Sequence, residues 1–217
     1  MRSRLSNTRV PAVLSVAIVA IGMLAMGAPS SAEAQARTFR IQRGGGSRVQ
    51  WVSDAPLERI TGVNSAVSGE LTVDPANLAA TRGRVDVAVA SMRTGIDLRD
   101  EHLRGPDWLD AGGHPNATLE ITGVEGATAL TGEGVQRVTI RGRFTLHGVT
   151  RDITAQAQVR LMRNNEELRG QGITGDLIRA QASFEIQLSD YQVSISAPVR
   201  LKVSNTIRIN VTIRAVS

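Results

Sequence analysis

The sequence predicts an all-β fold of eight or nine antiparallel strands with one short helical insert. Apolar and polar residues alternate in nearly every segment after residue 36, which is the pattern of strands that bury one face. No segment shows a convincing pattern for a long helix. One stretch, Ser91–Pro115, departs from the alternation, and it holds two of the three histidines, a tryptophan and a dense cluster of charges.

Residues 1–34 are expected to be a signal peptide that does not enter the fold. Three arginines precede an apolar run from Val10 to Ala25, and Ala32-Glu33-Ala34 has the small-residue pattern of a cleavage site. A retained membrane anchor is the alternative, although the run is shorter than the roughly 20 residues of a spanning helix. The chain has no cysteine, which excludes a lipoprotein anchor, disulfides and thiolate metal sites. We therefore expect a periplasmic or secreted protein with one domain at 35–217.

The charge distribution argues against a nucleic-acid partner. The formal net charge of +5 becomes +3 when three arginines and Glu33 leave with the leader. Lys202 is the only lysine, and the arginines are scattered along the chain. A nucleic-acid surface usually gathers basic residues into one patch with aromatic side chains.

The predicted strands follow one another at short intervals along the chain. They lie at 38–42, 48–51, 67–73, 85–89, 117–122, 137–146, 152–161, 182–188 and 207–213. The glycine-rich stretch Arg43–Ser47 is interpreted as a turn, because glycine tolerates positive φ. A phosphate-binding loop is the alternative there, but the Lys-Ser/Thr and the helix that it needs do not follow.

Strands of this number either stack as a sandwich or close as a barrel. The inward rows consist mostly of valine, isoleucine, leucine and alanine, and the chain has few aromatic residues. Small inward residues such as Gly142, Ala155 and Ala157 favour a barrel whose lumen has room in it. The composition does not exclude the alternative, a sandwich with a tightly packed core.

The Ser91–Pro115 stretch is interpreted as a helix that covers one end of the fold. Thr94-x-x-Asp97 resembles a capping box, and Gly105-Pro106 is a helix stop signal. Asp100 and Glu101 are then expected on the solvated face of this helix, together with nearby arginines.

An enzyme is the competing hypothesis for the same stretch. His102, Asp107, Asp110 and His114 could supply a metal site for hydrolysis. However, the two histidines are 12 residues apart across glycines and a proline, and they do not form an i, i+4 pair. The serines lack a G-x-S-x-G context, and His147 is expected to make a hydrogen bond that fixes the turn before Gly148. We therefore predict no catalytic residue, no metal and no cofactor.

Three ordered motifs resemble those of the YceI-like family. The first comprises Ser91–Gly95, Arg99–Leu103, Trp108–Asp110 and His114-Pro115; the second is Phe144–Arg151; the third is Phe184–Tyr191 followed by Pro198. The resemblance covers residues 37–216. It implies a single antiparallel, eight-stranded, lipocalin-like barrel that holds a polyisoprenoid or similar long-chain lipid, for transport or storage. The opening stretch Arg43–Arg48 departs from the family, because only Ser47 matches the usual Asp-x-x-His-Ser.

The inward rows supply the candidate lining of the lumen, since each methylene moved from water into it contributes about 0.8 kcal/mol. The predicted lining residues are Val87, Val89, Leu119, Ile121, Phe144, Leu146, Ala157, Val159, Phe184 and Ile186. The predicted rim or lid residues are Trp51, Trp108, Leu109 and Tyr191.

The expected partner is a long-chain isoprenoid lipid or a quinone-like ligand. The sequence does not decide whether the protein contacts a membrane peripherally or forms a homodimer. The outward arginines Arg137, Arg141 and Arg143 could meet anionic headgroups or form a solvated face. The alternative function is an envelope protein-interaction or stress-response module without a bound lipid.

Overall fold

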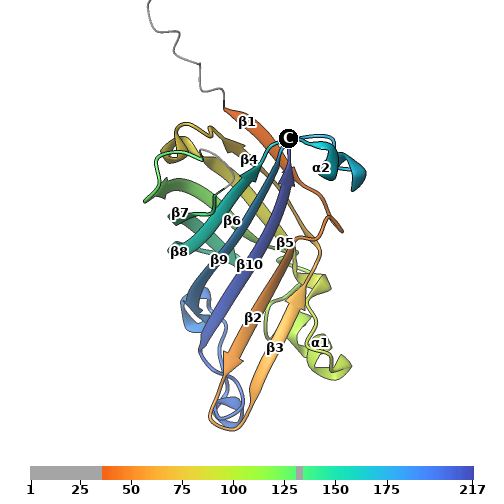
Figure 1. Cartoon of the computed structure of the whole chain (residues 1–217). Coiled ribbons are helices and arrows are strands. Elements are labelled where there is room, and N and C mark those ends of the chain that lie inside the picture. Colours follow the sequence, from red (N-terminus) through yellow and green to blue (C-terminus); the bar gives the residue numbers. More distant parts are fainter. Residues whose placement is uncertain (1–35, 131–133) are drawn as a thin grey trace, which may run out of the picture. The chain divides into compact units, whose positions relative to one another are not determined.

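The computed structural model describes residues 36–130 and 134–217. The predicted signal peptide, residues 1–34, lies outside the described residues. The strands are β1 (Arg37–Ile41), β2 (Arg48–Asp54), β3 (Arg59–Asn64), β4 (Val67–Val73), β5 (Arg82–Ala88), β6 (Asn116–Glu125), β7 (Gln136–Leu146), β8 (Val149–Met162), β9 (Leu177–Gln187) and β10 (Thr206–Val216) (Figure 1). The helices are α1 (Asp97–Arg104) and α2 (Glu166–Gly170), with 3-10 turns η1 (Leu78–Ala80), η2 (Val89–Ser91), η3 (Leu188–Tyr191) and η4 (Ala197–Val199).

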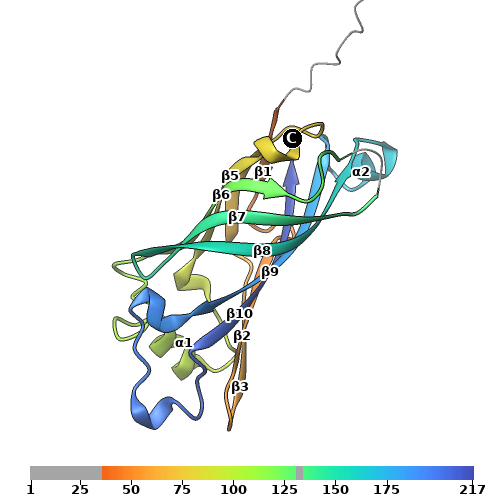
Figure 2. The same cartoon turned by 90° about the vertical axis from the view of Figure 1, so that its left-hand side faces the viewer.

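The connections gather at two opposite ends of the sheet (Figure 2). Helix α1, the turn between β2 and β3, and η4 lie together at one end, which we call the α1 end. Helix α2 and η1 lie at the other end, which we call the α2 end. The 126–130 turn belongs to the α2 end, because Leu78 N donates to Thr128 O at 2.9 Å and Leu130 N donates to Pro75 O at 2.7 Å.

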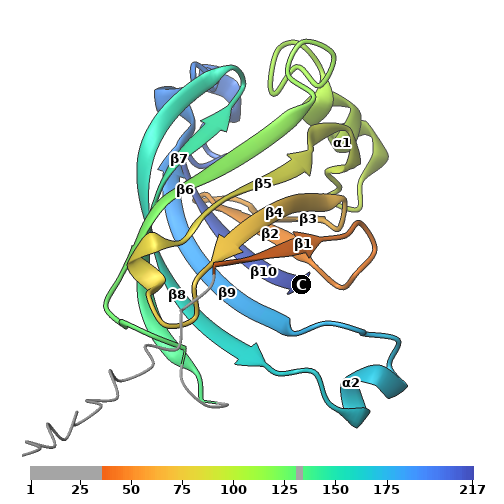
Figure 3. The ribbon, with the colours of Figure 1, turned by 90° about the horizontal axis from the view of Figure 1, so that it is seen from above.

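The sheet closes on itself, which confirms the predicted eight-stranded antiparallel barrel. The strand order is β1-β4-β5-β6-β7-β8-β9-β10, and β1 pairs in turn with β10 at Arg40 and Val216. Figure 3 shows this ring from above. Closure pairs the edges that an open sheet would expose. The β2–β3 hairpin continues from the same strand, because β2 pairs with β10 from Arg48↔Thr212 to Ser53↔Ile207.

Ser47 marks the place where β10 changes partner from β1 to β2. Its hydroxyl donates to Arg214 O at 3.2 Å and accepts from Arg214 N at 2.9 Å. The preceding glycines Gly44 and Gly46 have φ of +76° and +83°, as a tight turn requires. The predicted turn at Arg43–Ser47 is therefore confirmed.

Strand β3 was not predicted, because its inward face is not apolar. Ile60, Gly62 and Asn64 occupy its buried positions, so the alternation of apolar and polar residues is lost. Asn64 is held by its own hydrogen bonds, donating to Ala88 O at 2.7 Å and accepting from Ala66 N at 2.7 Å.

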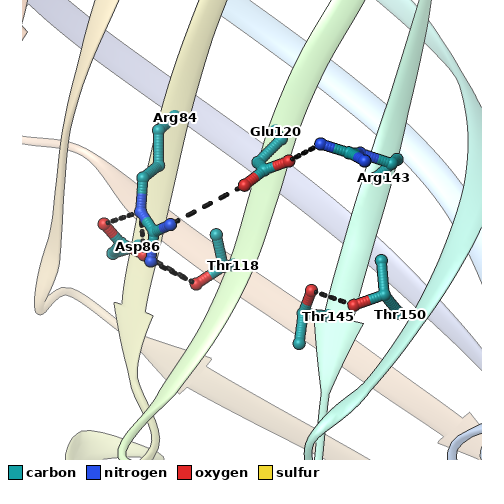
Figure 4. Close-up of polar contacts among 7 residues, drawn as sticks. All are labelled: Arg84, Asp86, Thr118, Glu120, Arg143, Thr145 and Thr150. Carbon is teal, nitrogen blue, oxygen red and sulfur yellow. Dashed lines mark hydrogen bonds and ion pairs between the residues drawn. The ribbon is translucent and has the colours of Figure 1, made fainter.

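The outer face of the barrel carries ion pairs that run across β5, β6 and β7 (Figure 4). Arg84 lies 2.9 Å from Asp86, and Glu120 lies between Arg84 and Arg143. Burial opposes ionisation of Asp86, but hydrogen bonds from Arg84 and Thr118 hold its pKa below the ordinary value. Of the three outward arginines, Arg141 pairs with Glu125 and Arg143 with Glu120, so this surface is already neutralised in part.

Asp176 joins three segments at the α2 end. Its carboxylate accepts from Arg37 Nη1 at 2.7 Å, from Arg163 Nη1 at 2.9 Å and from Asn164 N at 2.8 Å. The side chain is only 11% exposed. Burial opposes ionisation, but the hydrogen bonds from Asn164 and Arg163 and the two guanidinium charges hold the pKa of Asp176 below its usual value.

Asp176→Ala is expected to lower the free energy of unfolding at neutral pH by about 2 kcal/mol, because charged hydrogen bonds are lost. Because folding lowers the pKa of Asp176, its ionised carboxylate stabilises the fold at pH values above the ordinary aspartate pKa of about 4. This contribution disappears as the pH falls through the folded-state pKa. The difference between wild type and variant in urea unfolding should therefore shrink at low pH. Asp152→Ala, at an exposed position of β8, is the control, and an equal loss in both variants would contradict the assignment.

Candidate ligand-binding cavity

A cavity of about 420 Å³ occupies the interior of the barrel. Its walls come from β2 to β10 and are almost wholly apolar; the polar lining residues are Ser53, Glu58, Thr81, Thr94, Arg99, His102 and Lys202. The space exists because short side chains line adjacent strands: Ala155 in β8 and Ala180 and Ala182 in β9. Both β9 alanines are half-buried, and both line the cavity.

The cavity opens at the α1 end. His102 and Lys202 line it and are exposed, while Glu58 and Arg99 are half-buried. At the α2 end, in contrast, the lining residues Leu78, Leu130 and Ile178 are 2–4% exposed. We call the α1 end the mouth, since the polar lining residues there are the ones that reach water.

Helix α1 covers part of the mouth, but it does not begin as predicted. Its N-cap residue is Ile96, and no side chain caps it. Thr94 instead donates from both its backbone N and its Oγ1 to Asp100 Oδ1, each at 2.6 Å. Asp100 is 2% exposed, so the predictions of a Thr94–Asp97 capping box and of a solvated Asp100 are wrong.

The contact between Thr94 and Asp100 depends on Gly95, whose φ of +86° turns Thr94 back toward the helix. Burial opposes ionisation of Asp100, but the Thr94 hydrogen bonds and nearby arginine charges hold its pKa below the ordinary value. The helix ends at Arg104 with Gly105 as C-cap, as predicted. An ion pair of 2.8 Å between Arg99 and Glu58 ties α1 to the β2–β3 hairpin.

The structure brings most of the predicted lumen residues together. Eight of the ten line the cavity: Val87, Leu119, Ile121, Phe144, Leu146, Val159, Phe184 and Ile186. Val89 and Ala157 are buried but do not line it. Val89 begins η2 instead of continuing β5. Contact of these residues with a ligand stays a prediction.

Three of the four predicted rim residues also line the cavity, namely Trp51, Trp108 and Leu109. Tyr191 lies instead behind the wall, 1% exposed, with its ring edge-on to Phe144 at 5.7 Å between centroids. Burial, and secondarily the charge of Asp190, raise the pKa of Tyr191 to about 12. Its carbonyl oxygen meets His147 Nδ1 at 3.1 Å, so His147 does form a hydrogen bond at its turn.

The sequence interpretation missed the mouth residues Glu58, Lys202, Val199 and Val203. They lie in turns, where the period-two pattern gives no signal. The lining residues at the closed end, such as Ile178 and Ile213, continue the alternating rows and could have been found from them.

The four residues of the enzyme hypothesis do not form one cluster. His102 lines the mouth, whereas His114 packs edge-on against His147 with centroids 5.0 Å apart. Asp110 accepts from Gly113 N at 3.1 Å within its own turn, and Asp107 is exposed. Within residues 36–130 and 134–217, no three histidine or acidic side chains are placed to hold a metal ion together.

Trp51 packs flat against a glycine of the neighbouring strand. A Cβ placed on Gly62 would lie 2.0 Å from the indole Cε2 and 2.1 Å from Cζ2. The cross-strand register pairs these two residues directly. Gly62 is therefore required for Trp51 to take its place in the cavity wall.

Gly62→Val is expected to displace the indole and to lower the free energy of unfolding by about 1–3 kcal/mol, the usual cost of overpacking. The emission maximum of Trp51, read in a Trp108→Phe background, should shift as well. Gly123→Val in β6 is the matched control, because a Cβ there meets nothing within 4 Å. Equal stability of the two valine variants would refute this packing argument.

No helix in the part of the chain that the structure describes is both long and apolar enough to cross a membrane. Residues 40–215 match the family model of the YceI-like domain. A UPF0312 protein of Vibrio campbellii is 31% identical over 137 residues, which cover 62% of this chain and 69% of that protein. A UPF0312 protein of Vibrio parahaemolyticus is 32% identical over 107 residues, which cover 49% of this chain and only 53% of that protein.

Solved structures share the fold at low sequence identity. BcnA of Burkholderia cenocepacia has a TM-score of 0.63 at 20% identity, covering 80% of this chain and 98% of its own. A polyisoprenoid binding domain from Saccharophagus degradans, implicated in plant cell wall breakdown, has a TM-score of 0.60 at 18% identity, covering 84% and 99%. At such identities the likeness establishes the architecture alone.

Proposed function

The chain belongs to the YceI-like family, and we propose that it binds one long-chain apolar lipid, a polyisoprenoid or a prenyl quinone, inside the barrel for transport or storage. The observation that carries the proposal is the cavity of about 420 Å³ with an apolar wall, one closed end and a polar mouth. Such a cavity is within the size range of ligand sites. The name of the Saccharophagus degradans neighbour, a polyisoprenoid binding domain, supports the same ligand class.

The shape of the site suits a ligand with an apolar chain and one polar end. The apolar chain of the ligand would lie along the wall from Trp51 to Ile178. There, each methylene removed from water contributes about 0.8 kcal/mol, less the cost of ordering it. The polar end would stay at the mouth beside His102 and Lys202, the lining residues that reach water.

We propose a binding protein and not an enzyme. Capture of an apolar chain needs no reactive group, because apolar burial alone drives it. At the mouth, Glu58 and Arg99 neutralise each other at 2.8 Å, so the ionisable groups that remain there suit headgroup contact.

We also propose that the protein works outside the cytoplasm, after removal of residues 1–34. The charged, apolar and small-residue regions of the leader support this. Fractionation of its own cells, followed by N-terminal sequencing, would test it. A cytoplasmic protein that retains Met1 would contradict this location.

The lipid proposal can be tested with the two tryptophans of the chain, Trp51 and Trp108, which both line the cavity. A prenyl quinone quenches indole fluorescence, so titration should give saturable quenching at one quinone per chain. The matched quinone that lacks the prenyl tail should bind at least about a hundredfold more weakly, since most of the binding energy comes from apolar burial. Equal affinity for both quinones would rule out the lumen as the site.

A further inference from the structure

The mouth of the barrel carries most of the exposed apolar side chains in the described part of the chain. Six large hydrophobic residues are exposed among the described residues, and four of them belong to the α1 end: Leu57 (69%), Ile96 (50%), Leu98 (62%) and Leu201 (55%). Apolar groups that gather at one place on a surface usually mark a contact site. We call Leu57 and Leu201, with their neighbours Arg200 and Lys202, the mouth tip.

The mouth tip is one continuous surface built from two distant segments. Leu57 N donates to Leu201 O at 2.8 Å, which joins the turn between β2 and β3 to the turn that follows η4. Figures 1 and 2 both show these two turns side by side at the α1 end. The same turns supply lining residues of the cavity, namely Glu58, Val199, Lys202 and Val203. Whatever covers the tip therefore also faces the opening.

The charge of the tip is positive. Arg59 is paired with Asp54 at 3.2 Å, and Glu58 is paired with Arg99. Arg200 and Lys202, on either side of Leu201, are exposed and have no acidic partner within 4.0 Å among the described residues. Asp97 and Glu101 are exposed on α1, so the positive charge is concentrated at the tip and not on the helix.

We propose that the mouth tip docks onto the surface of an anionic lipid bilayer, with Leu57 and Leu201 inserted at the interface and Arg200 and Lys202 over the headgroups. Apolar side chains flanked by basic ones are the combination that binds such interfaces. Docking in this orientation places the mouth against the bilayer, so that an apolar chain passes between membrane and cavity without crossing water. The purpose of this contact rests on the proposed lipid-binding function, but the contact itself can be measured without any ligand.

Vesicle flotation tests the docking. The protein as recovered from its own cells is mixed with vesicles of phosphatidylcholine, or of equal parts phosphatidylcholine and phosphatidylglycerol. Wild type should float with the anionic vesicles. The double variant Leu57→Asp, Leu201→Asp should lose at least about tenfold in affinity, because two apolar contacts are replaced by repelled charges. Arg200→Gln should lower binding to the anionic vesicles by about fivefold and leave binding to neutral vesicles unchanged.

Val135→Asp is the matched control. Val135 is 56% exposed and directly precedes β7 at the α2 end, so flotation should be unchanged. All variants carry the same N-terminus, so residues 1–35 contribute equally to each. Wild type that fails to float, or equal flotation of the control and the double variant, would overturn the proposal. So would a change in oligomeric state of the double variant with flotation intact, since the tip would then be a subunit contact.

Quenching of tryptophan fluorescence by the prenyl quinone, measured on the same samples, separates the docking proposal from the lipid-binding proposal. The double variant should retain quenching, because neither leucine lines the cavity. Quenching without flotation would overturn the docking surface alone, whereas flotation without quenching would overturn the lipid-binding site alone.

Discussion

Replacing Ala182 by phenylalanine is expected to lower affinity for a prenyl lipid by at least about a hundredfold without unfolding the barrel. Ala182 lines the cavity from β9, where it pairs with Ala157 of β8 and with Val211 of β10. A phenyl ring at this position would occupy the space that the lipid chain needs. Because the ring enters an existing void and not packed core, the free energy of unfolding should change by less than about 1 kcal/mol.

Gln181→Phe is the matched control for the cavity-filling variant. Gln181 is the preceding residue of the same strand and is exposed on the outer face, because successive strand residues point to opposite sides. Its phenylalanine variant should bind lipid as wild type does, as read by quenching of Trp51 and Trp108. Full lipid uptake by Ala182→Phe would place the ligand somewhere other than the lumen.

Asp100→Ala is expected to have the largest effect on stability, a loss of about 3 kcal/mol in urea unfolding at neutral pH. The buried carboxylate accepts two hydrogen bonds from Thr94. Its removal therefore leaves a backbone donor and a hydroxyl without partners in a site that excludes water. The segment from Thr94 to α1 should then exchange its amide hydrogens faster, since this contact holds it over the mouth.

The loss of stability in Asp100→Ala should shrink as the pH falls. The pKa of Asp100 is lowered in the folded state, so its stabilisation is present above about pH 4 and is lost as the pH falls through the folded value. The exposed Asp97→Ala, three residues earlier in the same helix, should cost less than about 1 kcal/mol. Equal losses in the two variants would show that Asp100 does not anchor the segment.

The barrel and most of its lining could be predicted from the sequence because both follow from one physical rule. A strand in which apolar and polar residues alternate buries one of its faces. Phe144, Leu146, Phe184 and Ile186 lie on such faces. Where the inward positions are not apolar the rule fails, and β3, with Gly62 and Asn64 buried, was missed for that reason.

Local motifs were less reliable than periodicity at the mouth. Thr94 and Asp97 have the spacing of a capping box, but the positive φ of Gly95 directs Thr94 to Asp100 instead. Tyr191 was expected at the rim, whereas packing against Phe144 buries it behind the wall. Both outcomes depend on contacts between residues whose relative orientation no sequence pattern specifies.

The most direct test of the lumen as a lipid site is native mass spectrometry, with lipid extraction, on the protein purified from its own cells. The mass should exceed that of the polypeptide by one long-chain prenyl lipid, and the extract should contain that lipid in equimolar amount. The Ala182→Phe variant, purified in parallel, should have the mass of the polypeptide alone. A wild-type protein that shows the bare polypeptide mass, and that fails to take up any prenyl lipid when incubated with it, would contradict the proposed function.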